Sequence, residues 1–442
     1  MKTAAGAVLF FGVWVTHALS PVSTQYDSRW TVHTALSLLH EGNLDLDEYL
    51  PQLERDSFYY TQCVTPGGRV TWVRERSQCA GGHYYSFFPV GAVLLATPGV
   101  AAIEQAVKLA RPYTRAVAAP PLLRKVLDGD LVGGSAVVEV ALASLFVALT
   151  AVVVYTLVLH FRGVPVSLAI AVIFAFGTAA WSTVSRALWQ HGPSMLLLAG
   201  VLLLFLRTGR RPALAAVAWL PLAFSFIVRP TNAIAIVLFT AYVWVRHRKY
   251  FRCYLLWAAP AAAVFFTLTY WVYHSLVPPY FDPEHPSGGY LGLHPAFGEA
   301  LMGNLIAPAR GLFIFSPVVL LATWGILLRP PSDEARCLRP WLVAIICLHW
   351  VLISLFADWK GGHSIGPRYF SDLLPYFAWF LIPVFDRGKA AVAVLALLSL
   401  PGFWINHRCA TRFACHQWNI IPDDINRNEG RVWDWRDPPF LR

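Results

Sequence analysis

Long apolar runs separated by short polar stretches dominate the chain. Many of these runs reach about 17 residues, the length at which an α-helix crosses roughly 30 Å of hydrocarbon. We therefore expect an all-α polytopic membrane protein with about eleven transmembrane helices. The predicted spans are 1–20, 134–161, 165–182, 190–207, 212–228, 230–247, 252–276, 309–328, 339–357, 369–385 and 389–405.

Composition agrees with this pattern. Of the 442 residues, 57% are hydrophobic and only 14% are charged, whereas soluble domains are about a quarter charged. The formal net charge is +10. In a membrane protein such an excess reflects cytoplasmic loops that face anionic lipid, so membrane lipids are expected partners and nucleic acid is not.

The polar stretches alternate in character along the chain. One set is short and basic, and by the positive-inside rule these loops face the cytoplasm. The other set is richer in His, Trp, Pro and Gly, and these loops are then external. The basic loops contain Arg162; Arg207, Arg210 and Arg211; Arg246, Arg248, Lys249 and Arg252; Arg329, Arg336 and Arg339; and Arg387 and Lys389.

This alternation makes residues 21–133 one long external loop with amphipathic or interfacial helices. Within the loop, Phe87–Val107 is long enough to cross the membrane, but Pro89, Pro98 and two glycines interrupt it. A crossing here would also move Arg162 to the outside. We therefore expect Phe87–Val107 to lie in the membrane interface or to dip into the membrane and return, without spanning it.

The two ends of the chain raise separate questions. Segment 1–20 fits either a cleaved signal peptide or a retained helix, and we expect a retained helix because it would hold the following residues at the membrane face. The transmembrane domain is expected to end at residue 405. An external tail, 406–442, follows and contains Trp418, Trp433 and Trp435. We expect it to cover an external cavity.

Four cysteines fall on the predicted external side, where disulfides are stable. Their short separations favour pairing Cys63 with Cys79 and Cys409 with Cys415. A crossed pairing between loop and tail is the alternative. The cysteines predicted inside or within a helix, which should stay reduced, are Cys253, Cys337 and Cys347.

The first external loop carries a candidate base. Asp27 follows the first apolar segment closely and lies beside Arg29 and Trp30. A carboxylate fixed at a membrane surface can take a proton from a hydroxyl group. The same stretch also fits a solvated cap on a membrane helix.

Cationic side chains gather on the same predicted side. A cluster of arginines and histidines opposite a few carboxylates suggests a polar cavity for an anionic headgroup, because charges within a membrane are costly unless they are paired or wet. Each cation alone also fits a snorkelling or helix-capping role. The candidate phosphate contacts are Arg186, His191, Arg229, Arg310, Lys360, His363 and Arg368, and the carboxylates besides Asp27 are Asp45, Asp47, Asp282 and Asp358, with His285 near Asp282.

Common cofactor motifs are missing from the sequence. It has no HExxH, no CxxC and no phosphate-binding loop of the GxxxxGK type. We therefore expect no cofactor and no metal site, although a divalent metal remains open.

The order of these parts resembles the C-type glycosyltransferase superfamily, within it the protein mannosyltransferases and lipid A aminoarabinose transferases. The resemblance covers residues 1 to about 405 loosely. Two features differ from the family pattern: Ser28 stands where a second acid is usual, and Phe88-Pro89 replaces Pro-Pro. These differences leave the sugar and the acceptor open. The matching positions are Asp27, Arg29 and Trp30; Leu38, Leu39, Gly42, Asn43 and Leu44; Pro89 and Gly91; and segments 309–321 and 361–375.

The resemblance implies an enzyme that moves a sugar from a polyprenyl-phosphate donor to a hydroxyl group of a glycan, lipid or protein. It implies a bacterial plasma membrane, an external active site and a single inverting displacement. The chemistry is consistent with one carboxylate. The phosphate is already a good leaving group, so no general acid is needed, unlike in glycoside hydrolysis. Asp27 would be the base, with Arg29, Asp45 and Asp47 as supporting residues of the first loop.

Two other functions fit a helical membrane protein. A transporter or flippase for a lipid or glycan is one, although no internal symmetry of two matched halves is visible. A non-catalytic membrane scaffold is the other. Loss of glycan transfer in a folded Asp27→Asn protein would separate the enzyme from both.

Overall fold

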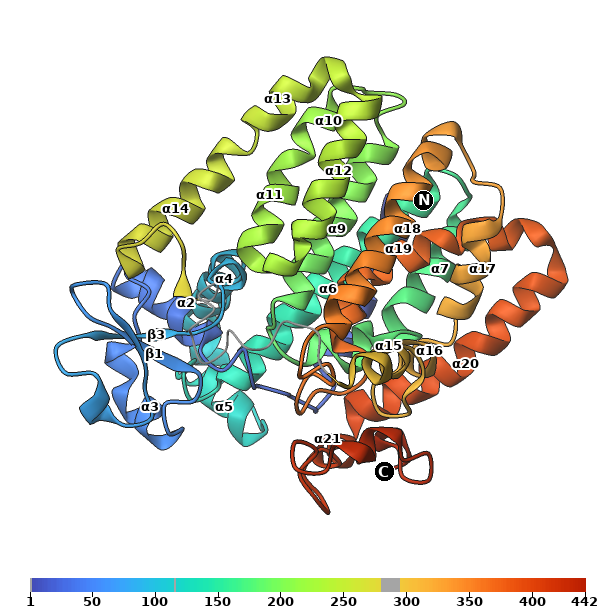
Figure 1. The fold of residues 1–442 in the computed structure, drawn as a ribbon. Coiled ribbons are helices and arrows are strands. Elements are labelled where there is room, and N and C mark those ends of the chain that lie inside the picture. Colours follow the sequence, from blue (N-terminus) through green and yellow to red (C-terminus); the bar gives the residue numbers. More distant parts are fainter. Residues whose placement is uncertain (1, 115–116, 280–294) are drawn as a thin grey trace.

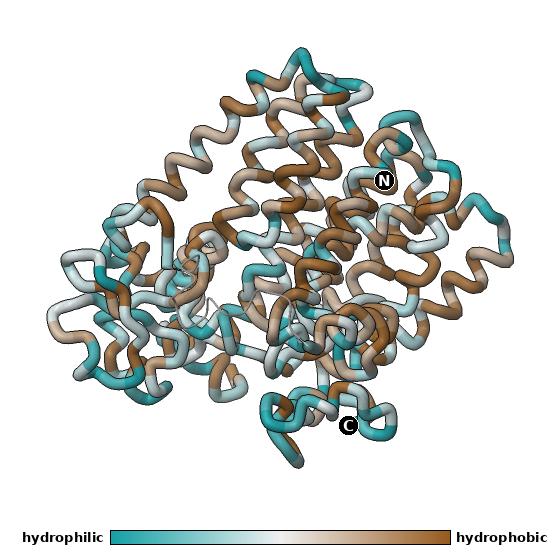
Figure 2. The backbone as a smooth tube through the Cα atoms, in the orientation of Figure 1, coloured by the Kyte–Doolittle hydropathy of each residue, from teal (hydrophilic) through white to brown (hydrophobic). Residues whose placement is uncertain are grey.

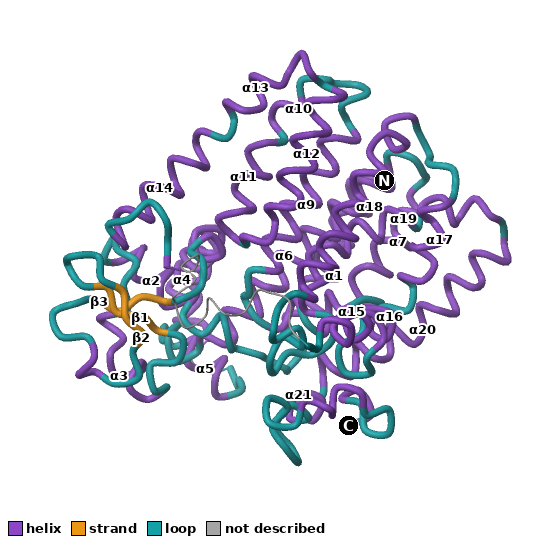
Figure 3. The backbone as a smooth tube through the Cα atoms, viewed as in Figure 1, coloured by secondary structure: helices purple, strands orange, loops and turns teal. Residues whose placement is uncertain are grey.

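The computed structural model describes residues 2–114, 117–279 and 295–442. Its described part is almost entirely helical, with one small sheet in the first loop (Figures 1 and 3). Five helices are long and apolar enough to cross a membrane, or six if one bent pair counts as a single span. The long helices are α4 (Gly91–Thr114), α6 (Ser135–Leu159), the run Arg248–Tyr273 with α13 (Phe251–Leu256) and α14 (Ala259–Tyr273), α18 (Asp333–Ser354) and α20 (Lys389–Thr411).

The prediction of eleven spans is not supported. Several predicted spans form shorter apolar helices or broken ones. Prolines explain two of the breaks, because proline lacks the N–H that continues a helix: Pro317 lies between two short helices, and Pro383 lies in a 3₁₀ stretch after α19. The shorter elements are α7 (Val164–Phe176) bent by 43° against α8 (Ala179–Ser182) and η3 (Val184–Arg186), α9 (His191–Leu206), α10 (Leu214–Val217), α11 (Trp219–Val228), η4 (Pro230–Asn232), α12 (Ala233–Arg246), α16 (Leu312–Phe315), α17 (Val319–Leu327), η8 (Arg368–Leu373), α19 (Leu374–Phe380) and η9 (Ile382–Arg387).

Helix α6 is the centre of the bundle. Two thirds of its apolar stretch is buried, and it packs against α7, α9 and the N-terminal helix α1 (Lys2–Ala18). Trp14 of α1 donates a hydrogen bond from Nε1 to the Ala141 carbonyl, 3.0 Å away, and Tyr155 donates to the Lys2 carbonyl at 3.0 Å. The first predicted apolar segment is therefore a helix that packs along the bundle.

The α12–α13 turn, one of the basic loops, and the described loops rich in His, Trp, Pro and Gly lie at opposite ends of the bundle. The residues around the α12–α13 turn form the polar tip at the top of Figure 2, while the described loops before α9 and before η8 lie toward the lower end. This separation is what the alternation of loops along the sequence predicts. The side of the membrane that each end faces stays a prediction.

The first loop folds beside the bundle and shares a hydrophobic core with residues of α6, such as Val138 and Leu142. It contains α2 (Thr31–His40), η1 (Asp47–Tyr49), α3 (Leu50–Arg55), α5 (Pro121–Leu127) and a sheet that the sequence analysis did not anticipate. The antiparallel strands have the order β2-β1-β3, with Cys63 of β1 opposite Thr71 and Tyr84. The strands are β1 (Thr61–Val64), β2 (Val70–Trp72) and β3 (His83–Ser86).

One of the two predicted disulfides is confirmed. Cys63 and Cys79 are bonded, with their Cα atoms 5.5 Å apart. The pairing of Cys409 with Cys415 is wrong in this structure, because both are free, buried thiols. Cys409 belongs to α20 and Cys415 to the next helix, α21 (Phe413–Gln417), so helical geometry fixes both backbones.

Helix α4 covers most of the segment Phe87–Val107, in which prolines were expected to interrupt the helix. The helix continues through Pro98 and Pro112, so the prolines do not break it. It is drawn nearly end-on in Figure 1, whereas α9, α11 and α12 run across the page, so α4 does not follow the direction of the bundle. Its length would allow a crossing. The interfacial position of this segment stays a prediction.

The tail begins later than predicted and packs under the lower end of the bundle (Figure 1). Helix α20 continues past residue 405 to Thr411. After α21, the tail forms η10 (Glu429–Trp433) and η11 (Pro439–Leu441). Trp418 is fully buried and packs with Ala300 and Ala307 of the neighbouring segment, which contains α15 (Phe297–Ile306). Its indole N–H donates to the Asp437 carbonyl at 2.6 Å.

Candidate functional site

The predicted base and one predicted cation form an ion pair. The Asp27 carboxylate contacts the Arg368 guanidinium, and the two side chains are 19% and 13% exposed. Asp27 lies in the turn between α1 and α2, and Arg368 begins η8. The glycines before Arg368 adopt left-handed backbone angles, with φ of +71° at Gly361 and +67° at Gly366. Glycine permits these turns without strain, and they direct Arg368 toward the first loop.

Arg368 is held from several directions. Its guanidinium carbon lies 4.5 Å from the centre of the Trp189 ring, within cation–π range. Its Nε donates to His191 Nε2 at 3.2 Å, and its Nη1 lies 3.4 Å from the Gly361 carbonyl. The guanidinium therefore has a defined position that does not depend on Asp27 alone.

A buried carboxylate lies behind His191. The imidazole Nδ1 is 3.1 Å from Asp372 Oδ1, and Arg229 pairs with the other carboxylate oxygen. Arginine only donates, so His191 accepts at Nε2 and carries its proton on Nδ1, toward Asp372. Two guanidinium groups and two carboxylates thus surround a neutral imidazole, and the network of Asp27, Arg368, His191, Asp372 and Arg229 has no net charge.

A second buried carboxylate supports the Asp27 turn. Glu139 of α6 accepts a hydrogen bond from Gln25 Nε2 at 2.6 Å and lies 3.3 Å from the Leu188 backbone N–H. It is fully buried. It therefore joins the chain just before Asp27 to the chain just before Trp189.

Glu139 and Asp372 were not among the site residues predicted from the sequence. Each lies in a stretch that was interpreted as a membrane span, 134–161 and 369–385. An acidic residue inside an apolar run is a functional signal in itself, because an isolated charge there is costly. That signal was present in the sequence.

Arg310 and Arg186, two predicted phosphate contacts, are occupied by backbone oxygens. Arg310 donates to the carbonyls of Lys360 at 2.8 Å and Gly362 at 3.0 Å, and to Asn419 Oδ1 at 2.7 Å. Arg186 donates to the Ser20 carbonyl at 2.9 Å and also to His17, at the C-terminal end of α1. Cations are favourable at the C-terminal end of a helix. Both side chains are at most 1% exposed.

Lys360 and His363 pair with acids of the tail. Lys360 Nζ is 2.7 Å from Glu429 Oε1 and 3.4 Å from Asp358 Oδ1. His363 Nε2 is 3.0 Å from Asp424 Oδ1. These contacts attach the tail to the loop that carries Arg368.

Tyr26 joins the tail to the residue next to Asp27. Its hydroxyl is 3.1 Å from His416 Nε2, and its ring packs between His363 and His416. Burial, and then the Asp424 carboxylate, raise the pKa of Tyr26. Burial, assisted by His363 and Arg310, lowers the pKa of His416 to about 4, so this imidazole is neutral at pH 7.

Three of the remaining predicted residues, Arg29, Asp45 and Asp47, lie within the first loop. Arg29 pairs with Asp56 at 2.5 Å and does not contact Asp27 in the described residues. Asp47 Oδ2 is 2.6 Å from His83 Nδ1, and one ligand atom each of Asp45, Asp47 and His83 lies within 4.8 Å of the others. These three side chains have the spacing of a cation site. Asp282 and His285 lie outside the described residues.

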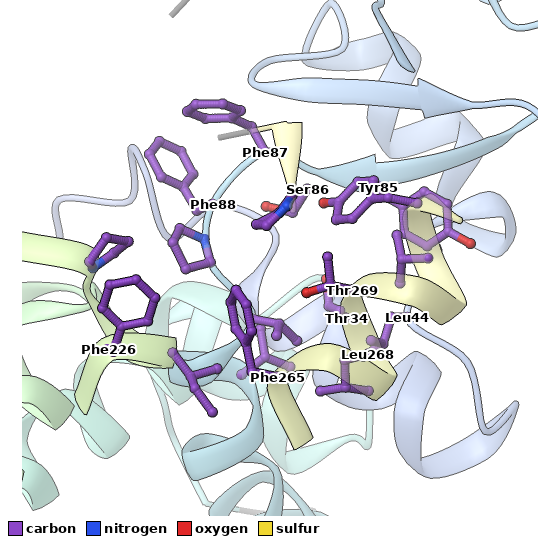
Figure 4. Close-up of a pocket in the computed structure, with 18 residues that line it drawn as sticks. Thr34, Leu44, Tyr85, Ser86, Phe87, Phe88, Phe226, Phe265, Leu268 and Thr269 are labelled. Atoms are coloured by element: carbon purple, nitrogen blue, oxygen red, sulfur yellow. The ribbon is translucent and has the colours of Figure 1, made fainter. Parts of the chain in front are cut away.

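An apolar pocket adjoins the network. It lies between the first loop and helices α11 and α14, with a volume of about 800 Å³ that includes its opening to solvent (Figure 4). Pro230, next to Arg229, lines it from one side, and Thr34 of α2 from another. The larger side chains that line it are Tyr85, Phe87, Phe88, Phe226, Phe265 and Tyr273. The pocket therefore meets the polar network at one point in the sequence, where Arg229 of the network precedes Pro230 of the pocket wall.

The comparisons with known proteins add no family. The chain matches no protein-family model, and no curated protein matches it at a significant level.

Proposed function

We propose that this protein is a membrane glycosyltransferase that moves a sugar from a polyprenyl-phosphate donor to a hydroxyl group of an acceptor. The observation that carries the proposal is the Asp27–Arg368 ion pair. It unites a carboxylate and a guanidinium from distant parts of the chain in a partly exposed position. A reaction that needs one base and one phosphate partner finds both there.

In the proposed reaction, the acceptor hydroxyl attacks C1 of the donor sugar and its proton passes to Asp27. The bond between C1 and the phosphate oxygen breaks, and polyprenyl phosphate leaves with an additional negative charge. Arg368 binds this phosphate. A cation at this point stabilises the transition state more than the ground state, because the charge on the phosphate grows as the bond breaks.

The surrounding residues fit this division of roles. Trp189 and His191 position the Arg368 guanidinium. Arg229 and Asp372 balance the charges behind it without reaching solvent, with side chains 5% and 0% exposed. The apolar pocket would accommodate part of the donor's hydrocarbon chain, since its walls are mostly aromatic and aliphatic.

The test is transfer by the full-length protein reconstituted in lipid nanodiscs, with a labelled prenyl-phosphate sugar and a mixture of hydroxyl acceptors. The Asp27→Asn protein should bind the donor but transfer no sugar, and the Arg368→Ala protein should lose donor binding and transfer together. Normal transfer by a folded Asp27→Asn protein would exclude Asp27 as the base. In a parallel assay in sealed proteoliposomes, donor that crosses the bilayer without transfer would favour a transporter.

A further inference from the structure

We propose that a phosphate group competes with Asp27 for Arg368, so that phosphate binding releases the Asp27 carboxylate. The inference concerns the regulation of the proposed site and rests on the proposed function for its catalytic consequence. Its structural basis is the ion pair itself. A carboxylate bound to a guanidinium is a weak base, so the pair as it stands is an inactive state of the site.

Arg368 is built to stay in place when Asp27 leaves. Its guanidinium stacks on Trp189 at 4.5 Å and donates through Nε to His191 at 3.2 Å. Asp372 in turn fixes the orientation of His191 at 3.1 Å. None of these contacts uses Nη2, the nitrogen that faces Asp27. An incoming phosphate oxygen can therefore replace the Asp27 carboxylate at Nη2 without moving the rest of the guanidinium.

Asp27 is the exchangeable member of the network. Its side chain is 19% exposed, whereas Asp372, the partner of Arg229, is fully buried. Among the described residues, Arg368 is the one ion-pair partner of Asp27. Displacing the Asp372 carboxylate from Arg229 would leave buried charges without partners. Displacing the Asp27 carboxylate from Arg368 instead exposes it to solvent or to the acceptor hydroxyl.

The other buried cations that were candidates do not offer the same exchange. The guanidinium groups of Arg310 and Arg186 are occupied by backbone carbonyls, which cannot move away singly. Lys360 is paired with Glu429 and Asp358. Among these cations, Arg368 is therefore the one that a phosphate can bind at the lowest cost, because only the partly exposed Asp27 carboxylate has to be displaced.

This competition orders the reaction. The donor phosphate binds Arg368 first, and only then is Asp27 free to accept the proton of a hydroxyl group. In the empty site Asp27 stays neutralised by Arg368, so the base is not available while no donor is bound. Removal of the Asp27 carboxylate should therefore strengthen phosphate binding and at the same time abolish sugar transfer.

The experiment measures binding by the full-length protein in phosphatidylcholine nanodiscs. The probes are farnesyl phosphate, inorganic phosphate and, as an uncharged control, farnesol. The variants are Asp27→Asn, Asp27→Ser and Arg368→Ala. The matched control is Asp386→Asn, which removes the carboxylate of another Asp–Arg pair, with Arg162, beyond the far end of α6. Folding is checked by size-exclusion chromatography and thermal unfolding.

Asp27→Asn and Asp27→Ser should bind farnesyl phosphate about three to ten times more tightly than the unmodified protein, the effect of one partly buried ion pair. Arg368→Ala should lose this binding, and Asp386→Asn should leave it unchanged. An equal gain in affinity for inorganic phosphate would show that the site recognises the phosphate group alone. A gain in affinity for farnesyl phosphate only would show that it recognises a lipid headgroup. Unchanged or weaker binding by both Asp27 variants, or binding that survives Arg368→Ala, would overturn the proposal. The binding result stands whether or not sugar transfer is found.

Discussion

Arg310 and Asn419, which are hydrogen-bonded to each other, both donate to backbone carbonyls of the loop that leads to Arg368. Arg310 donates to the carbonyls of Lys360 and Gly362, and Asn419 Nδ2 donates to those of His363 at 2.9 Å and Ser364 at 3.3 Å. Arg310 also donates to Asn419 Oδ1 at 2.7 Å. The tail therefore helps to fix the conformation of the loop that carries Arg368. The expectation that the tail covers an external cavity stays a prediction.

We expect Arg310→Ala to act on stability. The substitution leaves several buried carbonyl groups and the Asn419 amide oxygen without a donor, and each charged hydrogen bond contributes about 1.5–3 kcal/mol. The variant should unfold at a markedly lower temperature than the parent protein in thermal unfolding followed by intrinsic fluorescence.

The matched variant is Arg310→Lys, which keeps the charge but loses the planar guanidinium. It should be destabilised nearly as much, because a single ammonium cannot reach all of these acceptors. Near-parental stability of both variants, together with loss of phosphate binding, would instead make Arg310 a ligand contact.

The disulfide arrangement gives a second prediction. Cys63→Ser should lower the stability of the first loop by about 3 kcal/mol, the value for a loop closure of this size. Peptide mapping without reductant should recover the Cys63–Cys79 crosslink and find Cys409 and Cys415 as thiols. A crosslink between Cys409 and Cys415 in the same map would contradict their free state.

The docking of the tail should depend on pH. Burial lowers the pKa of His416 to about 4, while in the unfolded chain it lies near 6.5. The unfolded tail therefore binds more protons between these values, and stability is lost as the pH falls from about 6.5 toward 4. The protection of the amides of residues 412–442 against hydrogen exchange, after correction for the intrinsic exchange rate at each pH, should fall between pH 7 and pH 5.

His416→Gln provides the control for this pH effect. A glutamine side chain can still bond Tyr26 but does not titrate, so the loss of protection at low pH should vanish. The groups that face His416, namely Tyr26, His363 and Arg310, stay in place in this variant. An equal pH response in the variant would assign the effect to another group, such as the His363–Asp424 pair.

The position of α4 is the fourth prediction. If α4 lies in the interface, Asp128 at the end of α5 lies on the same side of the membrane as Asp27. A cysteine placed at position 128 should react with a membrane-impermeant maleimide from the same side as one placed at position 56. Reaction of position 128 from the opposite side only would make α4 a true span.

The helical architecture and the Cys63–Cys79 bond were predictable from sequence because they depend on local properties. Apolar runs of sufficient length form helices wherever their backbone must satisfy its own hydrogen bonds. The number of spans was overestimated, since hydropathy does not reveal where a run such as 309–328 breaks or how short α9 and α11 become.

The partners of the charged residues were decided by tertiary structure alone. The sequence indicated a base, Asp27, and three cations, Arg186, Arg310 and Arg368, on one side of the membrane. It did not indicate that Arg368 would contact Asp27 or that the other two guanidinium groups would donate to backbone carbonyls. The physical reason is that a buried guanidinium group donates to those oxygen atoms that the folded loops bring within about 3 Å of it. That choice depends on how the turns before Arg368, the end of α1 and the tail meet in space, and hydrophobic pattern does not encode it.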